Sequence, residues 1–93
     1  MTIKKDKIEI LGKIYQIEYL GDDMMQGLLG SAKRITQKIN ISTNQSHDSA
    51  VETILHEVIH IIDGELKLEL SEETVARLAV GLYSAGYRNG GIK

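Results

Sequence analysis

Residues 54–62 combine six bulky aliphatic side chains with two histidines and one glutamate. On an α-helix, side chains four residues apart lie above one another on the same face. His56 and His60 would therefore point the same way, at a spacing that suits one metal ion. Glu57 would lie about 100° around the helix from His56, close enough to reach a water molecule on that metal without being a ligand. The pattern predicts a helix that is buried on nearly every side except the face with the histidines.

The order His-Glu-x-x-His is that of zinc peptidases, in which the glutamate acts as a general base toward metal-bound water. A five-residue match can also arise by chance, and the histidines would then be ordinary packing residues. Glu57 argues against that alternative, because burying an unpaired carboxylate in an apolar helix is costly. We therefore favour a metal site.

Composition narrows both the ligands and the class of protein. The 93 residues allow one domain, 1–93, with a modest core, and without cysteine a metal must be held by His, Asp or Glu. No stretch is long and apolar enough to cross a membrane, and no apolar run follows the basic first residues as it would in a signal peptide. A net charge of −2 gives no electrostatic footprint for nucleic acid. We expect a cytoplasmic protein that binds neither membranes nor nucleic acid.

Hydrophobic periodicity divides the chain into a strand-rich half, residues 1–45, and a helical half, residues 46–93. Alternation with a period of two predicts three strands, at residues 8–11, 14–20 and 34–42. Gly12-Lys13 is expected to link the first two strands as a hairpin. Residues 21–32 contain three glycines, and are expected to form an irregular loop or a short helical turn.

Capping residues set the expected helix boundaries. Ser46 or Asp48 should begin the helix that carries the histidines, and Gly64 is placed where a helix would end. Ser71 should begin a last helix that ends before Gly86. The expected fold class is α+β, with a small antiparallel sheet of about three strands packed on the His-Glu-x-x-His helix and a C-terminal helix.

A catalytic zinc site needs a third protein ligand and leaves its fourth position to water. The last helix has an inward apolar stripe formed by Val75, Leu78, Ala79 and Leu82. By helical geometry Glu72 lies roughly 60° from the centre of that stripe and Glu73 roughly 160° from it. Asp63 lies one turn beyond the histidines, which favours a hydrogen bond to a ligand imidazole over direct ligation. We predict Glu72 as the third ligand, with Glu73 and Asp63 as the alternatives.

The segments 53–60 and 72–79 together resemble the ImmA/IrrE-type metallopeptidases of bacteria and mobile elements. Members of that group carry H-E-x-x-H and a glutamate seven residues before the alanine of a Phe-Ala pair. Leu78-Ala79 stands for that pair here, and Glu72 falls on the glutamate. The chain is also similar to small phage-encoded or prophage-encoded zincin-like proteins, which follow a strand-rich part with an H-E-x-x-H run and a Ser-Glu-Glu helix.

This resemblance is specific over roughly residues 50–90, and covers the first half only in pattern. It implies a minimal gluzincin core, a hydrolase in which zinc is held by two histidines and a glutamate. Only eleven residues separate His60 from Glu72, fewer than in most gluzincins. That short link leaves little room for substrate-binding insertions.

Three interpretations follow. The first is a zinc metallopeptidase in which Glu57 activates water, and a peptide or protein substrate lies extended along the strand expected at 34–42. The second is a non-catalytic zinc-binding or interaction module encoded by a mobile element. The third is a metal-free adaptor. Tyr83 and Tyr87 are candidates for an oxyanion donor, although tyrosines in such places more often pack. The oligomeric state is left open, with a homodimer as one option.

Overall fold

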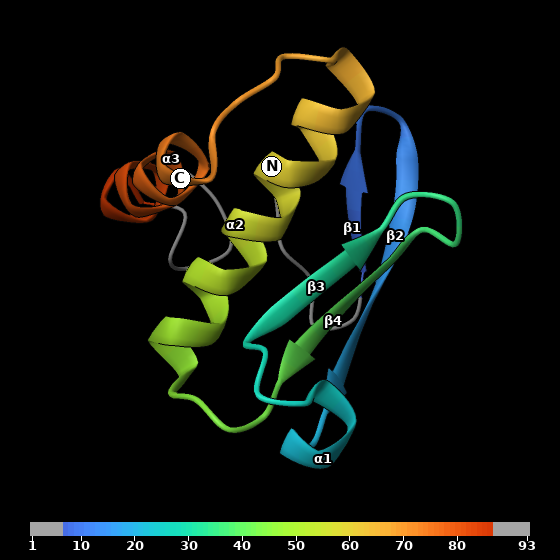
Figure 1. Ribbon diagram of the computed structural model, residues 1–93, viewed down its shortest axis with the longest axis vertical. Coiled ribbons are helices and arrows are strands. Elements are labelled where there is room, and N and C mark those ends of the chain that lie inside the picture. The colour runs from blue at the N-terminus through green and yellow to red at the C-terminus, as the bar shows by residue number, and fades with distance from the viewer. Residues whose placement is uncertain (1–6, 87–93) are drawn as a thin grey trace.

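The computed structural model describes residues 7–86, which form a four-stranded sheet and three helices. The elements are, in chain order, β1 (Lys7–Ile10), β2 (Lys13–Leu20), α1 (Asp22–Met25), β3 (Gly30–Lys33), β4 (Lys38–Ser42), α2 (His47–Leu66) and α3 (Glu72–Ser84). In Figure 1, α2 lies between the sheet and α3, so the fold has three layers. The predicted α+β class is confirmed.

The first two strands form the predicted hairpin, but its turn is Leu11-Gly12 and not the expected Gly12-Lys13, because Lys13 already belongs to β2. β1 pairs antiparallel with β2, with Lys7 opposite Gln16 and Ile10 opposite Lys13. The two residues between the strands, Leu11 and Gly12, both have positive φ angles, 50° and 81°. Two-residue turns with positive φ at both positions match the twist of the strands they connect, and glycine takes this conformation without steric cost.

The prediction of one strand over residues 34–42 is wrong in its first half. Residues 34–37 form a turn closed by a hydrogen bond from the Gln37 N–H to the Arg34 carbonyl oxygen, 3.3 Å. Ile35, which continued the alternating pattern, is 99% exposed at the tip of this turn. The strand β4 begins only at Lys38. A fourth strand, β3, occupies part of the stretch expected to be irregular.

The sheet is mixed rather than antiparallel. Its strand order is β1-β2-β4-β3, with β2 and β4 parallel and the other two pairings antiparallel. β4 therefore lies between two strands and has no open edge to offer a substrate, which corrects the expectation for residues 34–42. The strand next to it, β3, forms the edge of the sheet.

Two apolar clusters bury α2 on two sides. Toward the sheet, Ile54, Val58 and Ile61 of α2 pack with Tyr15 and five strand isoleucines. Toward α3, Leu55 and Ile59 pack with Val75 and Ala79. Because both clusters recruit most of the aliphatic residues of α2, the remaining face of the helix carries His56 and His60.

The helix boundaries agree with the capping signals, with one exception. The Ser46 side chain caps α2 by accepting a hydrogen bond from the Ser49 N–H, and Ser71 caps α3 in the same way through Thr74. The prediction that Gly64 ends α2 is wrong, since the helix continues to Leu66. A Cβ atom at Gly64 would lie 2.8 Å from Nε of Arg34. Glycine there accommodates the guanidinium group instead of ending the helix.

The contact between β3 and α2 has a testable consequence. A Cβ atom on Gly30 would lie 2.5 Å from Cγ2 of Thr53, so Gly30→Ala must push β3 away from α2. We expect a loss of about 1–3 kcal/mol in the free energy of unfolding, typical of overpacking. Gly81, inside α3, is the matched control because an added Cβ meets nothing within 4 Å. Gly81→Ala should stabilise by about 0.4–1 kcal/mol. Urea denaturation checks both values, and equal effects at the two sites would contradict the close packing of β3.

Candidate metal centre

The His-Glu-x-x-His segment lies in the middle of α2, where helical spacing places both imidazoles on one face. The two rings have their centroids 4.8 Å apart, and the Nε2 atoms of His56 and His60 are 3.1 Å from each other. Both histidine side chains are partly buried, so this face of α2 is only partly exposed to solvent. The two nitrogens point at a common position.

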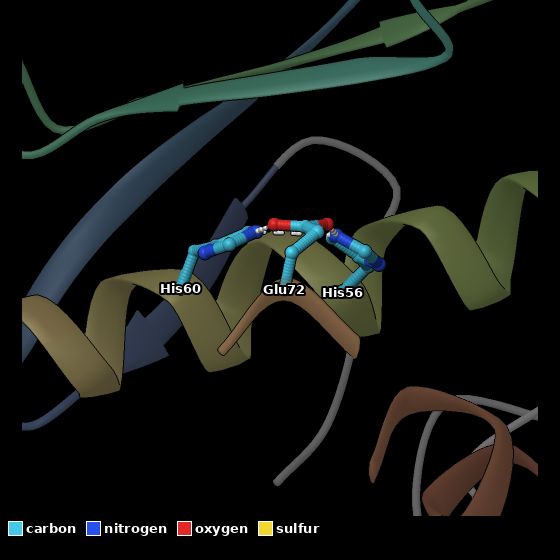
Figure 2. A group of neighbouring side chains, drawn as sticks. All are labelled: His56, His60 and Glu72. Carbon is cyan, nitrogen blue, oxygen red and sulfur yellow. Dashed lines mark hydrogen bonds and ion pairs between the residues drawn. The ribbon is translucent and has the colours of Figure 1, made fainter. Parts of the chain in front are cut away.

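Glu72 reaches that position from the other helix. Packing of α3 against Leu55 and Ile59 brings its N-terminal end over the histidines, and the Ser71 cap makes Glu72 the first residue of the helix. Figure 2 shows the Glu72 carboxylate between the two rings. Its Oε1 atom lies 2.7 Å from Nε2 of His56, and Oε2 lies 3.0 Å from Nε2 of His60.

These three residues are placed to hold a metal ion. One ligand atom from each lies within 4.8 Å of the others. Ligands about 2.0–2.1 Å from a tetrahedral metal are separated by roughly 3.3–3.4 Å, slightly more than the spacings found here. A bound cation would satisfy all three groups at once.

The two alternative ligands lie elsewhere. The Asp63 carboxylate accepts a hydrogen bond from the Leu70 N–H, 3.1 Å, and not from a histidine as expected. The backbone oxygen of Asp63 also accepts from Leu68, so this residue holds the link between α2 and α3 at both ends. Glu73 forms an ion pair with Arg77 one turn along α3. The sequence does not predict this role of Asp63, because its side chain binds a backbone N–H seven residues away, beyond the end of α2.

Glu57 occupies a different environment from Glu72. Glu57 as a whole residue is only 9% exposed, whereas the Glu72 side chain is 68% exposed. Desolvation by burial raises the pKa of the Glu57 carboxyl, while His56 and His60 lower it and Glu72 raises it. Glu57 therefore interacts electrostatically with all three residues of the metal centre. No hydrogen bond joins its side chain to another group within residues 7–86.

A stability prediction follows from this burial. The pKa of Glu57 is raised above its ordinary value of 4.5, so the folded protein binds more protons than the unfolded chain between the two values, and stability falls as pH rises through that window. In the metal-free protein, Glu57→Gln should raise the free energy of unfolding at pH 7, because the amide carries no charge for burial to penalise. The gain should vanish below pH 4.5. Urea titrations in chelator measure it, and an unchanged or lower stability at pH 7 would contradict a buried carboxylate.

A cavity of about 640 Å³ opens beside His56 and Glu57. Its walls are the N-terminal half of α2, residues 27–30 before and at the start of β3, and Tyr83 of α3. Tyr83 also packs against the cluster between α2 and α3, which is the packing role considered for it. Tyr87 lies outside the described residues. His47 is the first residue of α2 and is exposed, which leaves it outside the metal centre.

Within residues 7–86, no helix is both long and apolar enough to cross a membrane. Comparison with protein-family models, with curated proteins and with solved structures finds no match for this chain.

Proposed function

We propose that the protein is a zinc-dependent metallopeptidase with zinc held by His56, His60 and Glu72. The observation that carries the proposal is the placement of Glu57, a buried carboxylate without a hydrogen bond among the described residues, beside a group of three converging ligand atoms. Burying such a carboxylate is unfavourable for the fold. Its position is explained if it acts as a base on water at the metal centre.

The donor set favours zinc. Two histidines and one glutamate form one of the ligand sets of catalytic zinc sites, in which a fourth position stays open. The Nε2 atoms and the Glu72 carboxylate meet on the solvent side of α2, which leaves room for that position. When bound, zinc supplies a Lewis acid that lowers the pKa of coordinated water to about 7. The resemblance to the ImmA/IrrE-type metallopeptidases supports the same assignment.

In this mechanism the protein residues hold the metal and move one proton. Glu57 takes the proton of the attacking water and passes it to the nitrogen of the leaving amine. Burial suits Glu57 to this role. It raises the pKa of the carboxyl group toward neutral pH, where the group can both accept and donate a proton. The imidazoles and Glu72 stay fixed by their helices throughout.

The edge strand β3 is the best-placed element to bind an extended substrate. It lies at the edge of the sheet next to α2, and a Cβ atom on its first residue, Gly30, would be 3.4 Å from Oε2 of Glu57. A peptide that added to the sheet along β3 would gain main-chain hydrogen bonds and pass beside the catalytic carboxylate. We therefore propose a peptide or a flexible segment of a protein as the substrate.

Metal removal and reconstitution test the proposed function. Protein freed of metal with a chelator should cleave no member of a degenerate peptide library, and one equivalent of zinc per chain should restore cleavage. Cleavage products identified by mass spectrometry and zinc measured by elemental analysis give the two readouts. Zinc binding without any cleavage would favour the alternative, a non-catalytic zinc-binding module. Protein that binds no zinc at neutral pH would contradict both.

A further inference from the structure

The cavity beside Glu57 continues away from the metal centre along α2. Asp48, Glu52 and His56 are spaced four residues apart, so they lie along one face of this helix and all line the cavity. At 1.5 Å per residue, Glu52 is about 6 Å along the helix from His56, and Asp48 about 12 Å. The cavity therefore has a reaction centre at one end and two carboxylates toward the other.

These carboxylates have no cation beside them. Within the described part of the chain, no lysine or arginine lines the cavity or forms an ion pair with Asp48 or Glu52. The neighbouring hydroxyl donors are also engaged, because Ser49 and Thr53 both donate to the side-chain oxygen of Gln45, at 2.7 and 3.1 Å. The cavity thus offers negative charge that the surrounding residues leave uncompensated.

The opposite wall is apolar. Leu28 and Leu29 line the cavity and are 57% and 51% exposed. Such a wall can cover the methylene groups of a long side chain while its charged end reaches water or an acid. Lysine and arginine have this combination of an aliphatic stem and a cationic end.

A role in helix stability explains only part of this arrangement. Asp48, in the first turn of α2, favours the positive end of the helix dipole. Glu52 lies beyond the first turn, where that effect has fallen off. Glu57, which the proposed function uses as the base, lines the same cavity, is only 9% exposed, and has no side-chain hydrogen bond within residues 7–86. The end of the cavity with His56 and Glu57 and the end with Glu52 and Asp48 therefore belong to one cavity.

We propose that this cavity is a specificity pocket for a lysine or arginine side chain of the peptide substrate, adjacent to the scissile bond. The inference rests on the proposed function. The backbone of the substrate residue lies at the metal centre, its stem contacts Leu28 and Leu29, and its cation meets Glu52 and, farther out, Asp48. The pocket therefore selects basic over neutral side chains of the same length.

The test uses zinc-loaded full-length protein and four pools of acetylated nonapeptides, with lysine, arginine, norleucine or glutamate at the central position and random flanks. Cleavage within one residue of the centre should be about tenfold faster for the basic pools than for norleucine at low salt, and the ratio should fall as salt is added. The double variant Asp48→Asn/Glu52→Gln should reduce this ratio to near one. A second readout is retention of the pools on immobilised, zinc-loaded Glu57→Gln protein.

The matched control is Glu9→Gln/Glu18→Gln, which makes the same change in net charge on the sheet face away from α2. It should keep the basic preference. Equal treatment of the lysine and norleucine pools by the parent protein, survival of the preference in Asp48→Asn/Glu52→Gln, or its loss in the control would each overturn the pocket. Failure of the proposed function is distinguishable, because no pool would then be cleaved by zinc-loaded protein while retention still reports on the pocket.

Discussion

Glu72→Ala is expected to weaken zinc binding by more than about 100-fold. This exceeds the usual effect of changing a residue that only hydrogen-bonds to a metal ligand. The reason is geometric. The Glu72 carboxylate lies 2.7 and 3.0 Å from the two imidazole nitrogens, and its removal leaves only two donors from one helix. It also removes the metal-mediated connection between α2 and α3. Competition titration against a chromophoric chelator measures the affinity.

Glu73→Ala is the matched control for this variant. It removes a carboxylate at the next position of the same helix end, where Glu73 contacts Arg77 and not the histidines. Zinc affinity should stay at the parental value. Asp63→Asn is a second control, because its remaining oxygen can still accept the hydrogen bond from the Leu70 N–H. If Glu73→Ala or Asp63→Asn lost zinc as strongly as Glu72→Ala, the proposed ligand set would be wrong.

Local signals were sufficient to predict the helices and the part of the chain that carries the site. Serine caps at 46 and 71 mark both helix starts, and aliphatic spacing marks the buried faces of α2. The angular estimate for the last helix was less accurate, since Leu78 is 44% exposed. The buried residues are Val75 and Ala79, and Glu72 precedes Val75 by one turn. Glu72 thus reaches the histidines from the rim of the helix interface.

The sheet was less predictable because its outer part depends on distant contacts. The β3 sequence, Gly-Ser-Ala-Lys, has no apolar alternation, and small residues are required there because α2 passes close to Gly30. Ile35 had the opposite effect, since an exposed turn residue continued the strand pattern. The parallel pairing of β2 with β4 joins segments about twenty residues apart, and no single-segment signal encodes it. The identity of the edge strand therefore required the structure.

Glu57→Gln should abolish most peptide cleavage while leaving zinc in place. Loss of a general base typically costs about 10²–10⁴-fold in rate, and the amide keeps the shape of the carboxylate without its basicity. Zinc content should be unchanged, because Glu57 is not one of the three residues whose ligand atoms converge. Initial rates on the best library peptide and zinc per chain are measured on the same preparation.

Glu73→Gln provides the control for Glu57→Gln, because it neutralises an exposed acid close to the metal centre but outside the cavity. It should keep both zinc and activity. Full activity of zinc-loaded Glu57→Gln would mean that another group accepts the proton, and loss of zinc from this variant would mean that Glu57 helps to hold the metal. Since the same substitution is expected to stabilise the metal-free fold, reduced cleavage cannot be attributed to unfolding. Lower activity together with higher stability would show that the buried carboxylate is retained for the reaction and not for the fold.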